Sequence, residues 1–514
     1  MKVTVIILCI FFTTVHGGRI LVVVPTPSFS HQIVFRPLTQ ELAKRGHDVV
    51  VITTDPVNKN KENLQNLKEI DVHDVSYEIW RKSFMNNTAF GRKKDLYKSV
   101  ELFLTGFSDT LEVQLKSEEV KKLIRGELGT FDLLILETSV RPALIFSHIF
   151  RAPVIQMCTF GPMLNSNGIV GAPSHFFLYP WVLHQRLYNL TIWEKIKELI
   201  THWQIYNLYM NLELAEEEML RRVMGPGIPS LQELSKNVQI MFYNSYPIWC
   251  DNQPVPPNVV YIGGIHIQPE KELPKDLKSY LDSCNNGVIY VSFGNNVKPS
   301  LMPSDKIQML TSIFSELPYN VLWRWDADVP GTSANIKTIR WVPQTDLLRH
   351  PNVKLFITQG GLQSAEESIN AGVPIIGVPM IADQWYNAEK FEYFKIGKKV
   401  YLDSSTKDEF KDAIMTVVQD KSYRENVLKL RQLMRDQPMS ALNRAVWWTE
   451  YVLRNGGAKQ LQAPAANMPW TDYYEIYFIL TLLAIAIISL AVLVTLMFYL
   501  LNLLKGFKNK VKIT

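Results

Sequence analysis

The sequence predicts an α/β protein built from two doubly wound domains, each a parallel sheet with helices on both faces. Apolar strands at 19–24 and 48–53 flank an amphipathic helix from His31 to Arg45, which is the pattern of a parallel strand–helix–strand unit. A second series of apolar strands and helices begins at Gly287. The length of 514 residues accommodates roughly two to four structural units.

The composition is that of a folded protein without a nucleic-acid partner. Hydrophobic residues make up 47% and charged residues 20%, which excludes disordered and fibrous classes. The formal net charge of +5 is too small for a nucleic-acid-binding surface. Besides Cys9, the chain has only Cys158, Cys250 and Cys284, with no CxxC pair. Neither a disulfide scaffold nor a zinc site is predicted.

Residues 1–17 have the composition of a secretory signal peptide. Lys2 precedes an apolar run from Val3 to Val15, and Gly17 ends the segment. A basic start, a short apolar core and a small residue near the cleavage point are typical of such signals. A first core strand is the alternative, but the strand at 19–24 follows immediately.

The segment 476–504 contains no charged residue and is long enough to cross a bilayer, which needs about 20 apolar residues. Asp472 and Glu475 precede it, whereas the tail 505–514 carries four lysines. Positive residues stay in the cytosol, so a single-pass type I protein with a lumenal body is predicted.

The tail and two sequons indicate the endoplasmic reticulum. The last five residues, 510–514, fit the KxKxx pattern of cytosolic retrieval signals. Lysines that snorkel to the membrane interface are the alternative. Asn86 and Asn189 begin N-x-T triplets, which are compatible with glycosylation in the lumen.

The N-terminal domain is expected to span 18–250. Further buried strands at 131–136 and 154–158 flank a helix at 142–150. Residues 176–212 mix aromatic and aliphatic side chains with few charges. They form either core helices or helices that lie on the membrane or line an apolar pocket.

A stretch rich in proline and charge, 251–286, is interpreted as the linker to a C-terminal domain at 287–439. The strands expected in that domain are 287–293, 320–325, 336–341, 353–358 and 374–379. A late helix and a spacer to the membrane occupy 440–475. Ligands of doubly wound sheets bind outside the carboxyl ends of the strands, so the cleft between the domains is the expected site.

The segment from Trp341 to Gln384 has the features of a diphosphate cradle. A buried strand at 354–358 breaks at the residues 359–361, Gln-Gly-Gly, and a helix begins near Ser364. Glycines at such a turn let backbone N–H groups approach an anion, and the helix N-terminus adds partial positive charge. The indole of Trp341 offers a flat face to a base.

This segment resembles, position by position, the nucleotide-sugar signature of the UDP-glycosyltransferases. The matching residues are Trp341, Gln344, Ser364, Glu367, Asp383 and Gln384. The similarity covers the whole chain, and 290–295 matches the first strand and turn of the family's donor domain. The variant at 358–364 is most similar to insect members. The resemblance implies a GT-B fold, in which two Rossmann-like domains face a cleft.

The resemblance also implies a UDP-sugar site. Its residues would be Gly294, Asn295, Trp341, Gln344, Gln359, Gly360, Gly361, Gln363, Ser364, Glu367, Asp383 and Gln384. Trp341 would stack on the uracil, and Glu367 would hold the ribose hydroxyls. Ser364 would donate to the diphosphate, while Asp383 and Gln384 would bind the sugar hydroxyls.

In the N-terminal domain the resemblance implies that His31 is the catalytic base. A hydroxyl is a poor nucleophile, and a neutral histidine can take its proton as the new bond forms. An exposed polar residue at a helix start is the alternative for a lone histidine. The family orients this base with an aspartate at a strand end, where this sequence has Glu137. Asp132 is expected to sit at the strand start instead.

Two departures lie in the cradle. Most family members carry a histidine where this sequence has Gln359, and an asparagine where it has Gln363. An amide donates a hydrogen bond without positive charge, so it should stabilise departing UDP less. The sequence therefore does not decide which UDP-sugar is preferred or how fast the sugar is transferred.

Two other charged groups have simpler explanations. Asp326 and Asp328 form a DxD triplet, which holds a cation in metal-dependent glycosyltransferases. Here the triplet follows an apolar strand and lies in a loop with Pro and Gly, so a solvated turn is favoured. The basic run 92–94 is too short for an anion or membrane patch and is better explained as a solvated face. No metal site and no cofactor are predicted.

The sequence thus predicts an inverting, metal-independent hexosyltransferase of the endoplasmic reticulum membrane. UDP-glucose, by similarity to insect members, would donate to a hydroxyl of a small lipophilic acceptor and give a β-glycoside. Such products serve detoxification or the conjugation of hormones and pigments. The alternatives are a non-catalytic lumenal protein that binds lipophiles and a glycosyltransferase that acts on membrane lipids. A homo-oligomer is compatible with this reading.

Overall fold

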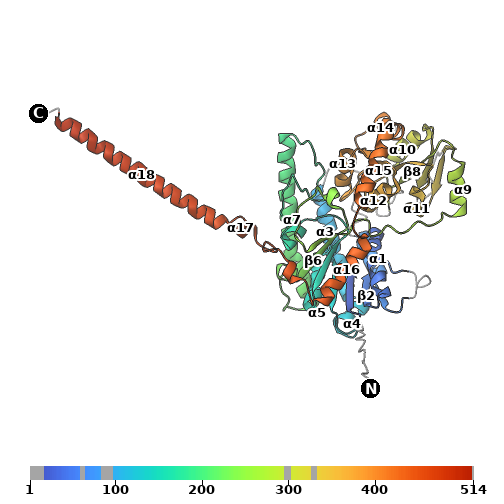
Figure 1. Cartoon of the computed structure of the whole chain (residues 1–514), viewed down its shortest axis with the longest axis horizontal. Coiled ribbons are helices and arrows are strands. Elements are labelled where there is room, and N and C mark those ends of the chain that lie inside the picture. The colour runs from blue at the N-terminus through green and yellow to red at the C-terminus, as the bar shows by residue number, and fades with distance from the viewer. Residues whose placement is uncertain (1–16, 58–63, 83–95, 295–301, 326–332, 512–514) are drawn as a thin grey trace, which may run out of the picture.

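The computed structural model describes residues 17–57, 64–82, 96–294, 302–325 and 333–511 (Figure 1). The expected signal peptide lies outside these residues except for Gly17. The other predictions that fall outside them concern Asn86, the basic run 92–94, Asn295, Asp326 and Asp328. These stay predictions.

Seven parallel strands form the N-terminal sheet. They are β1 (Arg19–Val24), β2 (Asp48–Thr53), β3 (Leu67–Asp71), β4 (Leu133–Glu137), β5 (Val154–Cys158), β6 (Val238–Tyr243) and β7 (Val259–Tyr261). Their order across the sheet is β3-β2-β1-β4-β5-β6-β7, so the winding reverses between β1 and β4. Doubly wound sheets bind ligands at the carboxyl ends of the strands beside such a switch point.

Helices cover both faces of this sheet, so its strands other than β3 are largely buried on both sides. They are α1 (Phe29–Lys44), α2 (His73–Trp80), α3 (Leu96–Lys116), α4 (Glu118–Ile124), α5 (Ile145–Phe150), α6 (Ser166–Val170), α7 (Ile192–Met224), α8 (Leu231–Ser235) and α16 (Ala441–Arg454). Apolar residues of α1 and α16 pack on one face, and those of α3, α5 and α7 pack on the other.

The C-terminal sheet has six parallel strands. They are β8 (Val288–Ser292), β9 (Asn320–Arg324), β10 (Ile336–Ile339), β11 (Val353–Thr358), β12 (Ile375–Gly377) and β13 (Gly397–Lys399). Their order is β10-β9-β8-β11-β12-β13, with the switch point between β8 and β11. The accompanying helices are α9 (Lys275–Ser283), α10 (Ser304–Ser315), α11 (Gln344–Leu348), α12 (Leu362–Ala371), α13 (Gln384–Tyr393), α14 (Lys407–Gln419) and α15 (Lys421–Arg435). Two doubly wound α/β domains are confirmed.

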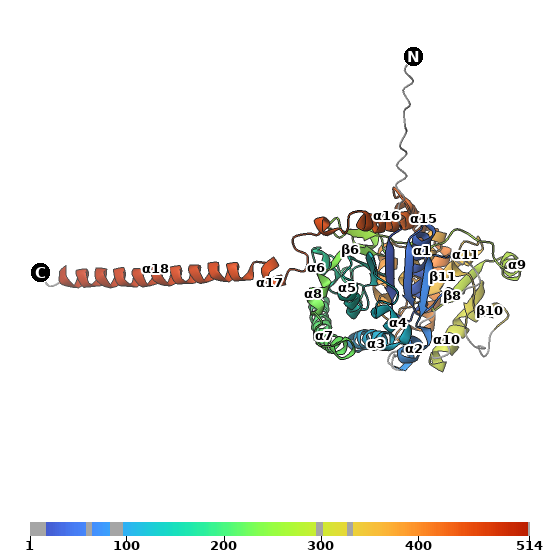
Figure 2. The ribbon, with the colours of Figure 1, turned by 90° about the horizontal axis from the view of Figure 1, so that it is seen from below.

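The connection between the domains is shorter than the expected linker 251–286. Within that range β7 joins the N-terminal sheet beside β6, because Val259 and Val260 are apolar and buried. Helix α9 belongs to the C-terminal domain, where Leu277 and Leu281 pack into its core. The late helix α16 returns to the N-terminal domain and lies beside α1 (Figure 2).

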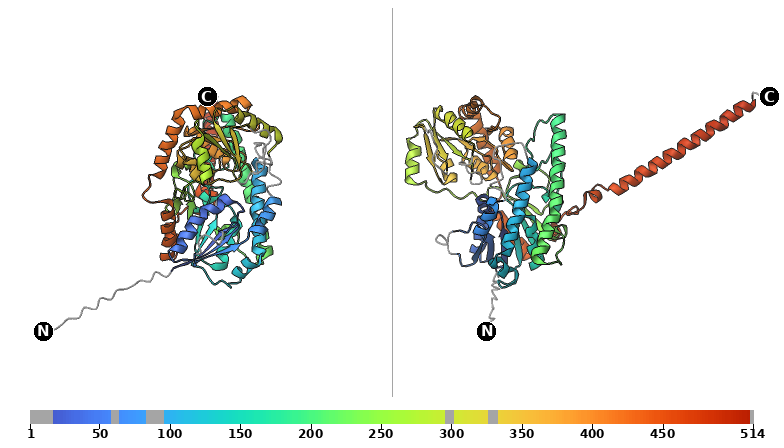
Figure 3. Two further views of the ribbon diagram at one scale, coloured as in Figure 1. Left: turned by 90° about the vertical axis from the view of Figure 1, so that its right-hand side faces the viewer. Right: turned by 180° about the vertical axis from the view of Figure 1, so that it is seen from behind.

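Beyond the body, α17 (Trp470–Tyr473) leads into α18 (Ile476–Val511), which projects away from both domains (Figure 1). Its segment Ile476–Gly506 has a mean hydropathy of 2.9 and is unburied, so it is long and apolar enough to cross a membrane. Helix α7 runs along the side of the body from which α17 and α18 depart (Figure 3).

Candidate active site

His31 and Glu137 meet at the switch point of the N-terminal sheet. His31 lies in the first turn of α1, directly after β1, and Glu137 is the last residue of β4. Because β1 and β4 are neighbours, their carboxyl ends bring the two side chains together across 106 residues of sequence. Nδ1 of His31 is hydrogen-bonded to Oε1 of Glu137, and both residues are buried.

Further contacts fix the orientation of this pair. The backbone N–H of Thr26 donates to Oε2 of Glu137 at 3.2 Å, and Oγ1 of Thr159 lies 3.2 Å from Nδ1 of His31. The ring of Phe160 packs edge-on against the imidazole at a centroid distance of 5.2 Å. With Nδ1 directed to a carboxylate, Nε2 is the nitrogen that can accept a proton. The extra methylene of Glu137 is accommodated, and the carboxylate reaches the histidine directly.

Asp132 occupies the opposite end of β4. It is exposed, and its Oδ2 accepts a hydrogen bond of 2.7 Å from the backbone N–H of Arg19. Asp132 therefore contributes to the strand start and lies away from His31.

The segment predicted to cradle a diphosphate forms a glycine turn that leads into α12. Gly360 has φ +90, a left-handed conformation that favours glycine, and Gly361 caps the N-terminus of α12. Gly294, with φ +75, approaches Gln359 so closely that a Cβ there would lie 2.3 Å from Nε2 of Gln359. Oε1 of Gln359 is buried and finds no hydrogen-bond donor among the described residues. This amide thus lies between two left-handed glycines at the positive end of a helix.

A hydrogen-bonded network joins the residues expected to bind the uridine. Nε2 of Gln344 donates to Oγ of Ser364 at 3.1 Å and to Oε2 of Glu367 at 2.7 Å. The hydroxyl of Thr345 donates to Oε1 of Glu367 at 2.9 Å, and that of Tyr290 donates to Oε1 of Gln344 at 3.1 Å. Burial raises the pKa of Glu367 despite the hydrogen bonds from Gln344 and Thr345. All five residues of this network belong to the C-terminal domain.

Trp341 stands at the edge of this network with 67% of its surface exposed. One face of its indole is therefore available for a base to stack on, as a nucleotide site requires. No other large aromatic of the described cradle segment 341–371 is exposed to this degree.

Asp383 is hydrogen-bonded to the first turn of α12 and to α13. Oδ2 accepts hydrogen bonds from the side chain of Asn387 at 2.7 Å and from the backbone N–H of Leu362 at 3.2 Å. Asn387 also donates to the carbonyl of Gly360 at 2.9 Å. Burial raises the pKa of Asp383 to about 6, and the nearby His31 opposes part of that increase.

The loop before Asp383 is strained in a way that is common at ligand sites. Ala382 adopts φ 50, a left-handed conformation that is costly for a residue with a Cβ. Oε1 of Gln384 holds this loop by accepting from the backbone N–H groups of Met380 at 2.8 Å and Ile381 at 2.9 Å.

Gln363 is placed differently from the other predicted donor-site residues. Its Nε2 donates to the carbonyl of Thr159 at 3.1 Å, which is a hydrogen bond between the two domains. Thr159 contacts His31 through its hydroxyl at the same time. Gln363 therefore ties the cradle helix to the catalytic side of the cleft.

Sequence reasoning did not identify Thr26, Thr159, Phe160 or Asn387. Asn387 lies one helical turn after Asp383, so its i,i+4 spacing on an expected helix was an available signal. The other three lie in loops after β1 and β5, and nothing in their local sequence indicates contact with a histidine or carboxylate elsewhere in the chain. Among the described residues no group of three or more His, Cys, Asp or Glu has the geometry to hold a metal ion.

Comparisons with known proteins show the family of the chain. The family model described as "UDP-glucoronosyl and UDP-glucosyl transferase" matches residues 18–512. An ecdysteroid UDP-glucosyltransferase of Spodoptera littoralis nuclear polyhedrosis virus is 36% identical over 486 residues, which cover 90% of this chain and 94% of the relative. UDP-glucosyltransferase 2 of Dactylopius coccus is 32% identical, over 92% of each chain.

A solved structure supports the fold. The crystal structure of the glycotransferase of kitacinnamycin superposes with a TM-score of 0.54 at 17% identity and covers 85% of this chain and 99% of its own. The two facing domains are those of the GT-B fold. The chain belongs to the family of UDP-glucuronosyl and UDP-glucosyl transferases and is a UDP-glycosyltransferase that transfers sugar from a UDP-sugar.

Proposed function

We propose that this protein transfers glucose from UDP-glucose to a hydroxyl of a small lipophilic acceptor with inversion, giving a β-glycoside. The observation that carries the proposal is the buried His31–Glu137 pair, in which the carboxylate holds Nδ1 of the histidine and leaves Nε2 to accept a proton. The donor domain is joined to this pair by geometry: Gln363 donates to the carbonyl of Thr159, and the hydroxyl of Thr159 contacts His31.

In this reaction Nε2 of His31 takes the proton of the acceptor hydroxyl as its oxygen forms a bond to the anomeric carbon. The bond between that carbon and the UDP oxygen breaks on the opposite face, which turns an α-linked donor into a β-glycoside. Glu137, held by the backbone N–H of Thr26, stabilises the imidazolium that results. UDP leaves with the bonding electron pair.

The donor domain would hold UDP-glucose along the cradle. Trp341 stacks on uracil, Glu367 accepts from the ribose hydroxyls, and the first turn of α12 faces the diphosphate. With a pKa of about 6, Asp383 is mostly ionised at neutral pH and can accept hydrogen bonds from sugar hydroxyls. Glucose is supported by the names of both relatives, which are UDP-glucosyltransferases.

A lipophilic acceptor is supported by the viral relative, whose name specifies an ecdysteroid, and by the setting of the N-terminal domain. We infer that α18 spans the endoplasmic reticulum membrane with the body in the lumen, because lysines follow the apolar segment. Helix α7 would then face the bilayer. It exposes a stripe of apolar side chains at intervals of three or four residues, namely Trp193, Ile196, Ile200, Trp203, Tyr206 and Met210.

The test is a product assay with the full chain in microsomes. UDP-glucose is supplied with a panel of apolar alcohols and phenols, and products are identified by mass spectrometry and by the proton NMR coupling of the anomeric centre. We expect β-glucosides, and at least about 100-fold less product in the same membranes carrying His31→Ala. An α-glucoside would contradict inversion, and the absence of any glycoside across the panel would contradict the assignment of the acceptor class.

A further inference from the structure

A segment of the N-terminal domain is embedded among helices of the C-terminal domain. Trp249 lies in η4 (Pro247–Cys250), a short 3₁₀ helix between β6 and β7 of the N-terminal sheet. Its indole is buried and belongs to one apolar cluster with side chains of α12, α13 and α15. The ring of Phe394 stacks on it at a centroid distance of 5.6 Å. Neither the proposed mechanism nor the cradle explains why a polar N–H group is placed in this cluster.

The indole N–H of Trp249 has one partner, and that partner belongs to the donor domain. It donates to Oδ1 of Asn387 at 3.1 Å. Nδ2 of Asn387 donates in turn to Oδ2 of Asp383 at 2.7 Å and to the carbonyl of Gly360 at 2.9 Å. An amide has two donor hydrogens and one acceptor oxygen, so these three hydrogen bonds together hold the amide of Asn387 in one orientation.

Asp383 depends on this amide for its own orientation. Its Oδ2 accepts from Asn387 and from the backbone N–H of Leu362. Burial raises the pKa of Asp383 to about 6, and the hydrogen bond from Asn387 opposes that increase. The amide therefore favours the ionised carboxylate, which is the form that accepts hydrogen bonds from hydroxyl groups.

Further contacts hold η4 against α13 on both sides of the indole. Nζ of Lys390 lies 2.6 Å from Oδ1 of Asp251, the residue that follows η4, and the side chain of Lys390 is fully buried. The hydroxyl of Tyr188 donates to the same oxygen at 2.8 Å. The hydroxyl of Tyr386 donates to the carbonyl of Trp249 at 3.2 Å. The indole N–H is thus held in a fixed place relative to Asn387.

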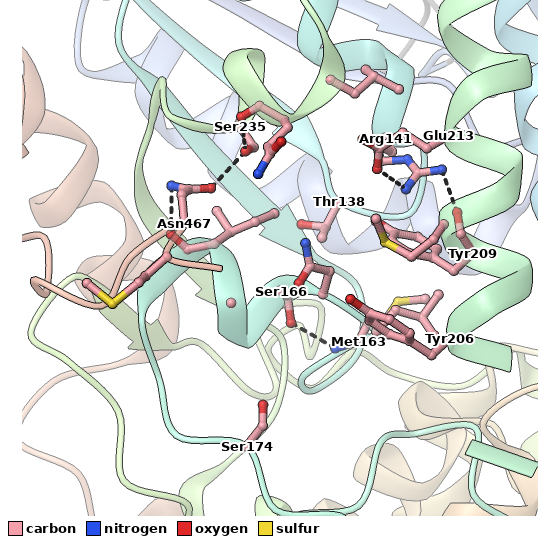
Figure 4. A pocket seen from close by; sticks show the side chains of 18 of the residues that line it. Thr138, Arg141, Met163, Ser166, Ser174, Tyr206, Tyr209, Glu213, Ser235 and Asn467 are labelled. Carbon is pink, nitrogen blue, oxygen red and sulfur yellow. Dashed lines mark hydrogen bonds and ion pairs between the residues drawn. The ribbon is translucent and has the colours of Figure 1, made fainter. Parts of the chain in front are cut away.

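The residues of this contact do not line the pocket of the N-terminal domain that α7 and the segment before α18 surround (Figure 4). Neither Trp249 nor Asn387 is among the described residues of its wall. A substitution at Trp249 should therefore leave that pocket unchanged and act on the donor side.

We propose that Trp249 is a positioning residue for the donor sugar and acts through Asn387 on Asp383. The N-terminal domain in this way sets the orientation of a carboxylate that belongs to the C-terminal domain. That Asp383 binds sugar hydroxyls rests on the proposed function, whereas the hydrogen-bonded chain from Trp249 to Asp383 does not.

The experiment compares binding of UDP-glucose and of UDP to the full chain in lipid nanodiscs, without an acceptor, by isothermal titration. UDP lacks the sugar, so only UDP-glucose should respond to the orientation of Asp383. Trp249→Phe keeps an apolar ring and removes the N–H group. We expect the Kd for UDP-glucose to rise by about 3- to 10-fold, the range for one neutral hydrogen bond, while the Kd for UDP stays within about twofold.

Trp323 provides a matched control. It is a buried tryptophan of β9 whose Nε1 makes no hydrogen bond to a described residue. Trp323→Phe removes the same atoms without breaking a hydrogen bond, so both affinities should equal those of the wild type. A Kd for UDP-glucose that rises equally in the two phenylalanine variants, or in neither, would overturn the proposal.

A second pair of variants keeps the test decisive if Trp249→Phe does not fold. Tyr386→Phe removes the hydroxyl that donates to the carbonyl of Trp249, whereas Tyr261→Phe removes a buried hydroxyl that has no described partner. Tyr386→Phe should weaken binding of UDP-glucose about threefold more than binding of UDP, and Tyr261→Phe should change neither. The same ratio of affinities in both tyrosine variants would count against the positioning role.

Asp383→Ala separates this inference from the proposed function. It should weaken binding of UDP-glucose and leave binding of UDP unchanged; if it leaves both unchanged, the sugar-binding role of Asp383 is wrong and the inference falls with it. If Asp383→Ala weakens UDP-glucose binding and Trp249→Phe does not, the inference alone is wrong. Binding of UDP-glucose that depends on Trp249, combined with no transfer to any acceptor, would contradict the proposed function and leave the inference standing.

Discussion

The two sides of the cleft differ in how their site residues are held. On the donor side, Gln344, Ser364 and Glu367 bond to one another before any ligand binds. On the acceptor side, His31 is fixed through Nδ1 alone, and its Nε2 makes no hydrogen bond to another described residue. A preorganised network suits a nucleotide that must be bound in one pose, whereas a base needs one atom free for the reacting proton.

The largest expected effect comes from the acceptor side. His31→Ala should lower turnover by roughly 10²–10⁴-fold, the usual contribution of a positioned base. The rate of glucoside formation at saturating UDP-glucose measures it, with a circular-dichroism spectrum as the control for folding. Retention of more than half of the activity would show that His31 is not the catalytic base, and the two sides would then not differ in this way.

The next largest effect tests the donor side. Gln359→Ala should raise the KM for UDP-glucose by about 10- to 100-fold, because a diphosphate oxygen would lose a hydrogen bond to a charged group. Gln359→His should preserve or raise activity, since it supplies a donor that can become positive as UDP departs. Normal kinetics of the alanine variant would show that Gln359 does not touch the donor, and an inactive histidine variant would show that the pocket is built around the amide.

A smaller effect is expected when the orienting carboxylate is shortened. Glu137→Asp withdraws the carboxylate from a histidine that Glu137 now contacts directly, while Thr26 and Thr159 stay in place. We expect a fall in kcat of about 10-fold with an unchanged KM for UDP-glucose, because only the positioning of the base is impaired. Full activity of the aspartate variant would show that the positioning of His31 does not depend on the length of the side chain at position 137.

The smallest expected effect is on stability across pH. Burial raises the pKa of Asp383 from 3.8 to about 6 in the folded protein, so the unfolded chain releases this proton more easily. The contribution of Asp383 to the free energy of unfolding is therefore complete below its ordinary pKa of 3.8. It is lost as the pH rises through about 6. The loss is about 3 kcal/mol, which shifts the melting temperature of a large chain by only a few degrees.

Thermal unfolding of wild type and Asp383→Asn at several pH values checks the direction in which stability changes with pH. The asparagine variant cannot ionise, so it should melt above the wild type by a margin that grows from acidic to neutral pH. A margin that shrinks as the pH rises would mean that the carboxylate, not the neutral acid, is favoured in the fold.

The difference between the donor side and the acceptor side also explains which parts of the site could be predicted from the sequence. Apart from Gly294 and Asn295, the expected donor residues lie within one segment, 341–384, whose turn and helix spacing can be recognised locally. The confirmed strands at 19–24 and 48–53 are apolar after a charged first residue, apart from Thr53. The contact between His31 and Glu137 depends on β1 and β4 being neighbours, which strand patterns alone do not specify. The role of Gln363 between the domains and the return of α16 to α1 depend on tertiary packing for the same reason.

The central claim is that His31 acts as the base while the donor side alone holds the nucleotide. Isothermal titration of UDP into the His31→Ala protein tests this claim most directly. UDP binding should depend on the cradle, Trp341 and Glu367, none of which hydrogen-bonds to His31 in the described structure. We predict a Kd within about twofold of the wild-type value, a difference under about 0.5 kcal/mol. A Kd raised tenfold or more would show that the catalytic histidine takes part in holding the nucleotide, and would contradict the separation of base and donor site.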